Sequence, residues 1–87
     1  MSDRKHQRLA ATEATGERLK ALFDDPAVSR WFDGTDDHYV DMLIAAKTDD
    51  ERREWAAMAR ALRELRTFVD GAVTDGARAR KELDEMR

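Results

Sequence analysis

The residues of this chain best suited to chemistry are one histidine and the acids around it. His38 directly follows Asp36 and Asp37, and Asp41 comes three residues later. Imidazole and carboxylate groups bind metals or transfer protons, but a metal site usually needs three or more converging ligands. Acidic and histidine side chains that follow one another within little more than one helical turn usually point into solvent and do not converge on a metal. We therefore expect no metal site and no cofactor. We interpret the acids as a solvent-facing acidic strip comprising Asp33, Asp36, Asp37 and Asp41.

Other catalytic patterns are missing from the sequence. There is no cysteine, and neither serine, Ser2 or Ser29, lies in a glycine-rich turn of the kind that presents a nucleophile. No glycine-rich phosphate loop occurs either. These observations predict a protein that is not an enzyme and has no small-molecule substrate.

A basic cluster of five arginines lies between residues 52 and 66. Its members are Arg52, Arg53, Arg60, Arg63 and Arg66. Basic helices bind phosphates, but three glutamates are interspersed among these arginines, and residues 24–50 carry two Lys/Arg against eight Asp/Glu. Intramolecular charge pairing is therefore expected, and nucleic-acid binding is not.

The strongest pattern is an apolar seven-residue repeat over residues 55–86. One set of positions comprises Trp55, Leu62, Val69, Gly76 and Leu83. The other set comprises Met58, Leu65, Ala72, Ala79 and Met86. A repeat of this period places one apolar seam along a helix, as in a coiled coil, and predicts that another helix covers it.

Two local signals divide the chain into three helices, over about 3–24, 26–47 and 49–87. Pro26 ends one helix and suits the first turn of the next, with Asp25 as its N-cap. Thr48 and Glu51 form a capping-box pattern at the start of the third helix. In the first helix, Gly16 interrupts the apolar stripe. It is interpreted either as a point of close backbone approach or as a tolerated glycine.

The continuity of the third helix is an open question in the sequence. Asp70-Gly71 and Asp75-Gly76 are turn dipeptides, and propensity alone would end the helix at Gly71. The seven-residue repeat keeps its phase through both glycines, however, whereas a turn would reset it. We favour one long helix, with a helix–turn–helix break as the alternative.

These elements predict an all-α fold in a single domain of residues 1–87. Two arms of similar length lie on either side of a turn near Thr48, so we expect a long antiparallel helical hairpin whose first arm is broken at Pro26. In that register Asp33 lies near Arg63, and Asp37 near Arg60. The alternative is a three-helix bundle with a projecting C-terminal helix.

A chain of this size buries only ~60% of its unfolded surface, so part of the apolar seam is expected to need a partner. Leu83 and Met86 are expected to be exposed in a monomer, because little of the first helix reaches them. No stretch is apolar enough for a membrane span. The predicted protein-interaction residues are Trp31, Val40, Ile44, Val69, Leu83 and Met86.

Three segments together resemble short helical proteins encoded in the structural modules of tailed bacteriophages. They are Leu22-Phe23-Asp24-Asp25-Pro26, Ala46 to Arg53, and Ala61 to Phe68, and a Gly76 to Ala79 tail completes the pattern. The resemblance covers roughly residues 16–87. It implies a virion or assembly protein that binds another virion protein or itself, in the cytoplasm of a bacterial host or incorporated in the virion. The alternative is a small acidic regulator that binds a basic surface of a host protein.

Overall fold

The computed structural model describes residues 2–87, and almost all of them are helical. Helix α1 spans Ser2–Asp24, α2 spans Pro26–Ala45 and α3 spans Asp49–Glu85. These bounds lie within two residues of those predicted from the sequence. The all-α prediction is confirmed.

The two helix starts form as their sequences predict. The Asp25 carboxylate accepts a hydrogen bond of 2.8 Å from the backbone N–H two residues later, and Pro26 occupies the first turn of α2. At α3, the Thr48 hydroxyl accepts a 3.1 Å hydrogen bond from the N–H of Glu51. The Glu51 carboxylate in turn accepts one from the N–H of Lys47, one residue before the cap. Side chains therefore satisfy backbone donors that the helix itself leaves free.

Helix α3 is continuous through Gly71 and Gly76, so the prediction of one long helix is confirmed and the alternative break is wrong. No glycine in the described chain has a positive φ. A helix of 37 residues extends about 56 Å, close to the 59 Å length of the whole molecule. Helix α3 therefore runs nearly the full length of the molecule, and the other two helices pack along it.

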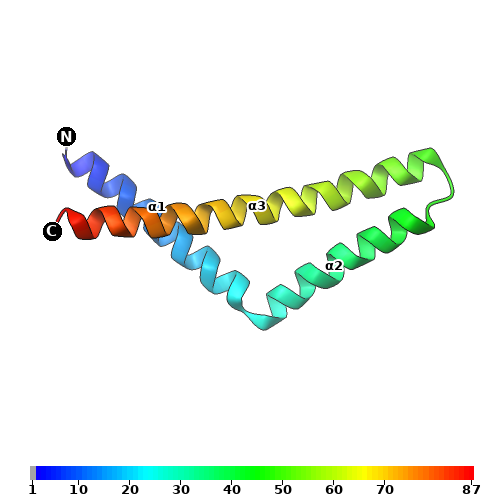
Figure 1. Cartoon of the computed structure of the whole chain (residues 1–87), viewed down its shortest axis with the longest axis horizontal. Helices are drawn as coiled ribbons and strands as arrows, with labels where there is room; N and C mark the ends of the chain where they lie inside the picture. Colours follow the sequence, from blue (N-terminus) through cyan, green and yellow to red (C-terminus); the bar gives the residue numbers. More distant parts are fainter. Residues whose placement is uncertain (1) are drawn as a thin grey trace.

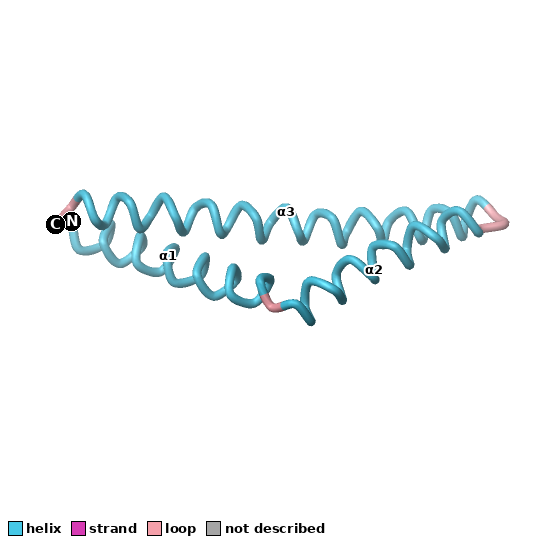
Figure 2. Tube along the Cα trace, turned by 60° about the horizontal axis from the view of Figure 1, so that its bottom comes forward, coloured by secondary structure: helices cyan, strands magenta, loops and turns pink. Residues whose placement is uncertain are grey.

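Helices α1 and α2 lie end to end along α3, with a bend at Pro26 between them (Figures 1 and 2). The two termini meet at one end of the molecule, and the α2–α3 turn forms the other. Helix α1 crosses α3 obliquely and packs most extensively against its C-terminal half. That half is therefore no projecting arm. The arrangement is the predicted hairpin with a broken first arm.

The hairpin register is close to the predicted one, with one correction. Arg63 pairs with Asp36, at 3.2 Å, rather than with Asp33. Arg80 and Glu17 form a second pair between arms, at 3.5 Å. The acidic α2 and the arginine-rich start of α3 do face each other, as their charges suggested.

The molecule is flat, and its core is thin. Its extents are 59 × 27 × 13 Å. The buried apolar side chains are Phe32, Ala59, Val69, Ala79 and Leu83. Figure 1, which looks down the shortest axis, shows α1 crossing α3, so the molecule is two helices deep at this crossing, whereas α2 and the N-terminal half of α3 lie side by side.

Candidate interaction surface

Two glycines define the contact between α1 and α3. A Cβ atom built on Gly16 would lie 2.8 Å from the carbonyl oxygen of Ala72 and 2.9 Å from the Cα of Gly76. Both distances are shorter than real Cβ contacts, and the atoms met belong to backbone that cannot swing away. Gly16 is therefore a point of close backbone approach. With its counterpart Gly76 it allows the two helices to touch directly.

Aromatic side chains lie both at the α2–α3 contact, where the ring centroid of Tyr39 in α2 is 5.9 Å from that of Trp55 in α3, and at the bend between α1 and α2. The ring of Phe32 lies 5.0 Å from that of Phe23 and 5.3 Å from that of Trp31, measured between centroids. The Arg66 guanidinium of α3 lies 5.9 Å from the Phe23 ring centre and 6.0 Å from that of Phe32. Such cation–π geometry holds the bend between α1 and α2 against α3. The helices here are separated by whole side chains.

These two contacts use different sides of α3. In the C-terminal half, α1 covers the predicted apolar seam, where Val69, Ala79 and Leu83 are buried. In the N-terminal half, Ala59 is buried while Met58 is 42% exposed, so the line of contact has moved around the helix. Helix α2 therefore leaves part of the seam open.

Two seam residues of this open part, Met58 and Leu65, form a continuous apolar strip with their neighbours Ala61 and Phe68. Met58, Ala61, Leu65 and Phe68 follow one another at spacings of three and four residues, which places them on one helix face. Leu65 is 47% exposed and Phe68 is 70% exposed. We refer to these four residues as the α3 strip. It contains Met58, Leu65 and Phe68, three large apolar side chains of α3 that are exposed.

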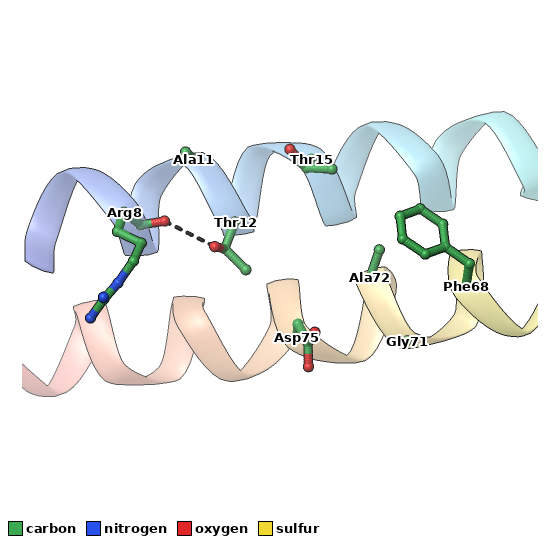
Figure 3. Close-up of a pocket in the computed structure, with 8 residues that line it drawn as sticks. All are labelled: Arg8, Ala11, Thr12, Thr15, Phe68, Gly71, Ala72 and Asp75. Atoms are coloured by element: carbon green, nitrogen blue, oxygen red, sulfur yellow. Dashed lines mark hydrogen bonds between the residues drawn. The ribbon is translucent and has the colours of Figure 1, made fainter.

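A groove continues the α3 strip where α1 begins to cover α3. Its volume is about 500 Å³. It is lined by Arg8, Ala11, Thr12 and Thr15 from α1 and by Phe68, Gly71, Ala72 and Asp75 from α3. Figure 3 shows Phe68 at one end of the groove and Arg8 at the other. The groove therefore runs from the apolar strip to Arg8 on α1, with the Asp75 side chain of α3 between its two ends.

The predicted interaction residues are divided among different environments. Trp31, Ile44 and Met86 are exposed, as expected for contact residues. The expected exposure of Leu83 is wrong, because α1 reaches the end of α3 and covers this side chain. Val69 is likewise buried, so neither side chain is accessible to a partner in this fold.

The predicted interaction residues of α2 do not form one surface, and Val40 is only half-buried. Trp31 and Val40 are nine residues apart, about two and a half turns, so they lie on opposite sides of α2. Val40 lines a second groove of about 490 Å³ on the other face of the molecule. Its other lining residues are Leu43, Ala56, Ala59, Arg60, Arg63, Glu64 and Thr67. Met58 and Leu65 of the α3 strip do not line it.

The acidic strip is also divided. Asp36 is turned toward α3 by its ion pair with Arg63. Asp33, Asp37 and Asp41 are exposed on α2.

Several arginines of the basic cluster pair with nearby acids of α3 itself. Arg52 lies 2.6 Å from Asp49, and Arg66 lies 3.5 Å from Asp70. These pairs, with that of Arg63, follow the predicted intramolecular charge pairing.

Sequence reasoning expected part of the seam to need a partner, but it did not single out the α3 strip as the part that stays open. Met58 and Leu65 belong to the seven-residue repeat, and their periodicity alone predicts burial. Phe68 is the signal that was available, because this large apolar residue lies outside both sets of seam positions. An aromatic beside the seam widens the apolar face beyond what one covering helix needs.

Among residues 2–87, no three histidine, aspartate or glutamate side chains are grouped closely enough to bind a metal ion. None of the helices in this range has both the length and the apolar character that crossing a bilayer requires. Comparison of the chain with protein-family models, curated proteins and solved structures finds no match.

Proposed function

We propose that this protein acts by contact, as a non-enzymatic assembly protein whose exposed helix faces bind another protein or a second copy of itself. The observation that carries the proposal is the unusual amount of surface left open by the flat fold. The chain has a solvent-accessible surface of 6923 Å². A compact monomer of its 10.0 kDa mass exposes only ~5,200 Å².

The excess is about 1,700 Å² by that relation. A standard protein–protein interface covers ~800 Å² of each partner. The radius of gyration agrees, at 18.1 Å against ~12 Å for a compact domain of 87 residues. The apolar side chains on this excess surface gain most by being covered, since burial is favourable by ~25 cal/mol per Å².

The setting of this assembly role is proposed on the sequence resemblance alone. The resemblance to structural-module proteins of tailed bacteriophages suggests a virion protein, or one that helps to build virions, in a bacterial host. The all-helical hairpin is compatible with that role.

The alternative function, an acidic regulator, has a weaker basis. It requires the acidic strip to be presented to a basic surface, but Asp36 already pairs with Arg63 within the chain. Asp33, Asp37 and Asp41 would carry the contact alone, with Ile44 beside them on the outer side of α2.

Photo-cross-linking in the cells that carry the gene tests the proposed function. A photoreactive phenylalanine analogue replaces Phe68 on the α3 strip in one variant, and the exposed Arg18 on the side of α1 away from α3 in a matched control. We expect discrete covalent adducts from position 68 and none from position 18. Adducts through an apolar surface persist at high salt, whereas contacts through the acidic strip weaken steeply above ~0.15 M salt.

Two results would count against the proposal. The first is the absence of adducts from position 68 and from an additional variant at Ile44. The second is the loss of all adducts when Asp33, Asp37 and Asp41 are replaced by asparagine, which would favour the acidic regulator.

A further inference from the structure

The groove between α2 and α3, on the face opposite the α3 strip, has an apolar floor and charges of opposite sign along its two rims. Its floor consists of Val40, Leu43, Ala56 and Ala59. No residue of α1 lines it, so α1 leaves this groove open. We infer that a second copy of this chain covers the α2–α3 groove, with a two-fold axis that runs above it, parallel to the helices. This inference rests on the proposed function of contact through exposed helix faces.

The α2 rim of the groove is acidic. Asp33 and Asp37 lie seven and three residues before Val40, so both share its side of α2. Asp41 follows one turn after Asp37. All three carboxylates are exposed, and none takes part in an ion pair within residues 2–87. This rim is therefore available to a positively charged partner.

The α3 rim of the groove carries arginines. Arg60 lines the groove, and Arg53 lies seven residues earlier on the same side of α3. Within the described residues Arg60 has no ion pair. Arg53 is 3.9 Å from Asp50, and both of these side chains are largely exposed. The second rim therefore offers the charge that the first one lacks.

Two contacts between α2 and α3 show which residues lie at the same level along the hairpin. They are the ion pair of Asp36 with Arg63 and the ring contact of Tyr39 with Trp55. Asp37 and Arg60 both lie between these two contacts. Asp41 and Arg53 both lie two residues beyond the second contact. Each acid is thus level with an arginine on the opposite rim, although no ion pair joins them within the chain.

A two-fold axis parallel to the helices keeps every residue at its own level and exchanges the two rims. Helix α2 of the second copy then lies over α3, antiparallel to it, and α3 of the second copy lies over α2. Asp37 of each chain meets Arg60 of the other, and Asp41 meets Arg53. Each pair forms twice, because the same patch is used on both chains. This charge complementarity identifies a second copy as the occupant of the groove.

The apolar floors of the two grooves meet at the centre of this arrangement. Two helical hairpins joined in this way form a four-helix bundle in which neighbouring helices are antiparallel. Val40 and Leu43, which are half-buried in one chain, then lie inside the bundle. The small side chains of Ala56 and Ala59 let the two layers approach closely. Exposed ion pairs contribute little by themselves, so the apolar floor supplies the attraction and the charges set the register.

Glu64 is the charge of the groove lining that disagrees with this register. It lies one residue after Arg63, near the level of Asp33, so two carboxylates face each other between the chains. Glu64→Lys should therefore lower the dissociation constant of the dimer, by ~5-fold at low salt, because an attraction replaces a repulsion. A higher dissociation constant for this variant would overturn the register.

The first experiment measures the mass of the purified full chain by sedimentation equilibrium at low salt and high micromolar concentration. We expect twice the 10.0 kDa chain mass. Asp37→Arg and Arg60→Asp should each raise the dissociation constant ~10-fold, because attractive pairs become repulsive. Arg78→Asp is the matched control, since it makes the same charge change at an exposed arginine of α3 outside the groove. It should leave the dissociation constant within ~2-fold of the wild-type value.

The second experiment mixes the Asp37→Arg and Arg60→Asp chains. In a mixed dimer the two introduced charges face each other and the two natural charges face each other, so both pairs attract. We expect the mixture to dimerise with nearly the wild-type dissociation constant, whereas each variant alone stays largely monomeric. A mixture that associates no better than its components would overturn the inference, because the charges would then act within one chain.

Circular dichroism checks that all variants keep their helices, which we expect because the replaced side chains are exposed. A monomeric wild-type chain would overturn the inference. A dimer that Phe68→Asp dissociates and Arg60→Asp does not would overturn it too, because the contact would then lie on the α3 strip. A monomer that still forms adducts from position 68 with another protein would overturn this inference alone and leave the proposed function in place.

Discussion

The two halves of α3 are covered in different ways by the two parts of the first arm. Against the C-terminal half, α1 packs through glycines, with backbone approaching backbone at Gly16 and Gly76. Against the N-terminal half, α2 packs through rings, with Tyr39 beside Trp55 of α3 and with Phe32 beside Phe23 at the bend. One sequence thus uses small residues to bring helices together and large ones to hold them apart.

This difference explains where the open surface lies. Close approach lets α1 lie directly on the apolar seam, which hides Val69 and Leu83. The bulk of the aromatic cluster and the bend at Pro26 place α2 beside the seam, so Met58 and Leu65 remain partly exposed. The α3 strip is therefore a consequence of two packing modes within a single hairpin.

The largest expected effect comes from removing the ring at the centre of the aromatic contact. Phe32 is 6% exposed, and its truncation leaves both a cavity and an uncovered neighbour. Phe32→Ala should lower the free energy of unfolding by ~3 kcal/mol, measured by urea denaturation. Trp31→Ala is the control. Because Trp31 is 60% exposed, its replacement should lower the free energy of unfolding much less. Equal losses would mean that the ring contact is not centred on Phe32.

The next largest effect on stability is expected from adding a methyl group at the contact between Gly16 and α3. In Gly16→Ala the new Cβ meets the backbone of α3, so the helices must separate, at ~1–3 kcal/mol for overpacking. The better helix propensity of alanine offsets ~1 kcal/mol of this. We therefore expect a net loss of stability in urea denaturation.

Gly71→Ala is the matched control for that variant. It is also a glycine within a helix, but a Cβ there has nothing within 4 Å. It should raise the free energy of unfolding by ~0.5–1 kcal/mol through helix propensity alone. If Gly16→Ala raised stability to the same extent, the close crossing of α1 and α3 would be refuted.

The smallest effects are expected at the ion pairs that join each arm segment to α3. Asp36→Asn removes the partner of Arg63, and Glu17→Gln removes that of Arg80. Exposed pairs contribute only ~0.2–1 kcal/mol. The Asp36 side chain is 34% exposed against 60% for Glu17, so we expect the larger loss from Asp36→Asn. Both losses should shrink in unfolding experiments at high salt, and a loss that did not would point to packing instead of charge.

Local sequence rules predicted the helices well because their causes lie within a few residues. The caps at Asp25 and Thr48 and the proline break depend on neighbours along the chain. The continuity of α3 through Gly71 and Gly76 was predictable because the apolar repeat keeps its phase. The burial of Leu83 was not predictable, because it depends on how far α1 extends along α3.

The sequence by itself determined three helices, their bounds and an apolar seam, because hydrogen bonding and side-chain periodicity act over short distances. Only the tertiary structure decided which side of α3 each segment occupies. That choice depends on Gly16 meeting Gly76, sixty residues away, and on the direction that the chain takes after Pro26. The open strip follows from these long-range contacts, and no local pattern encodes it.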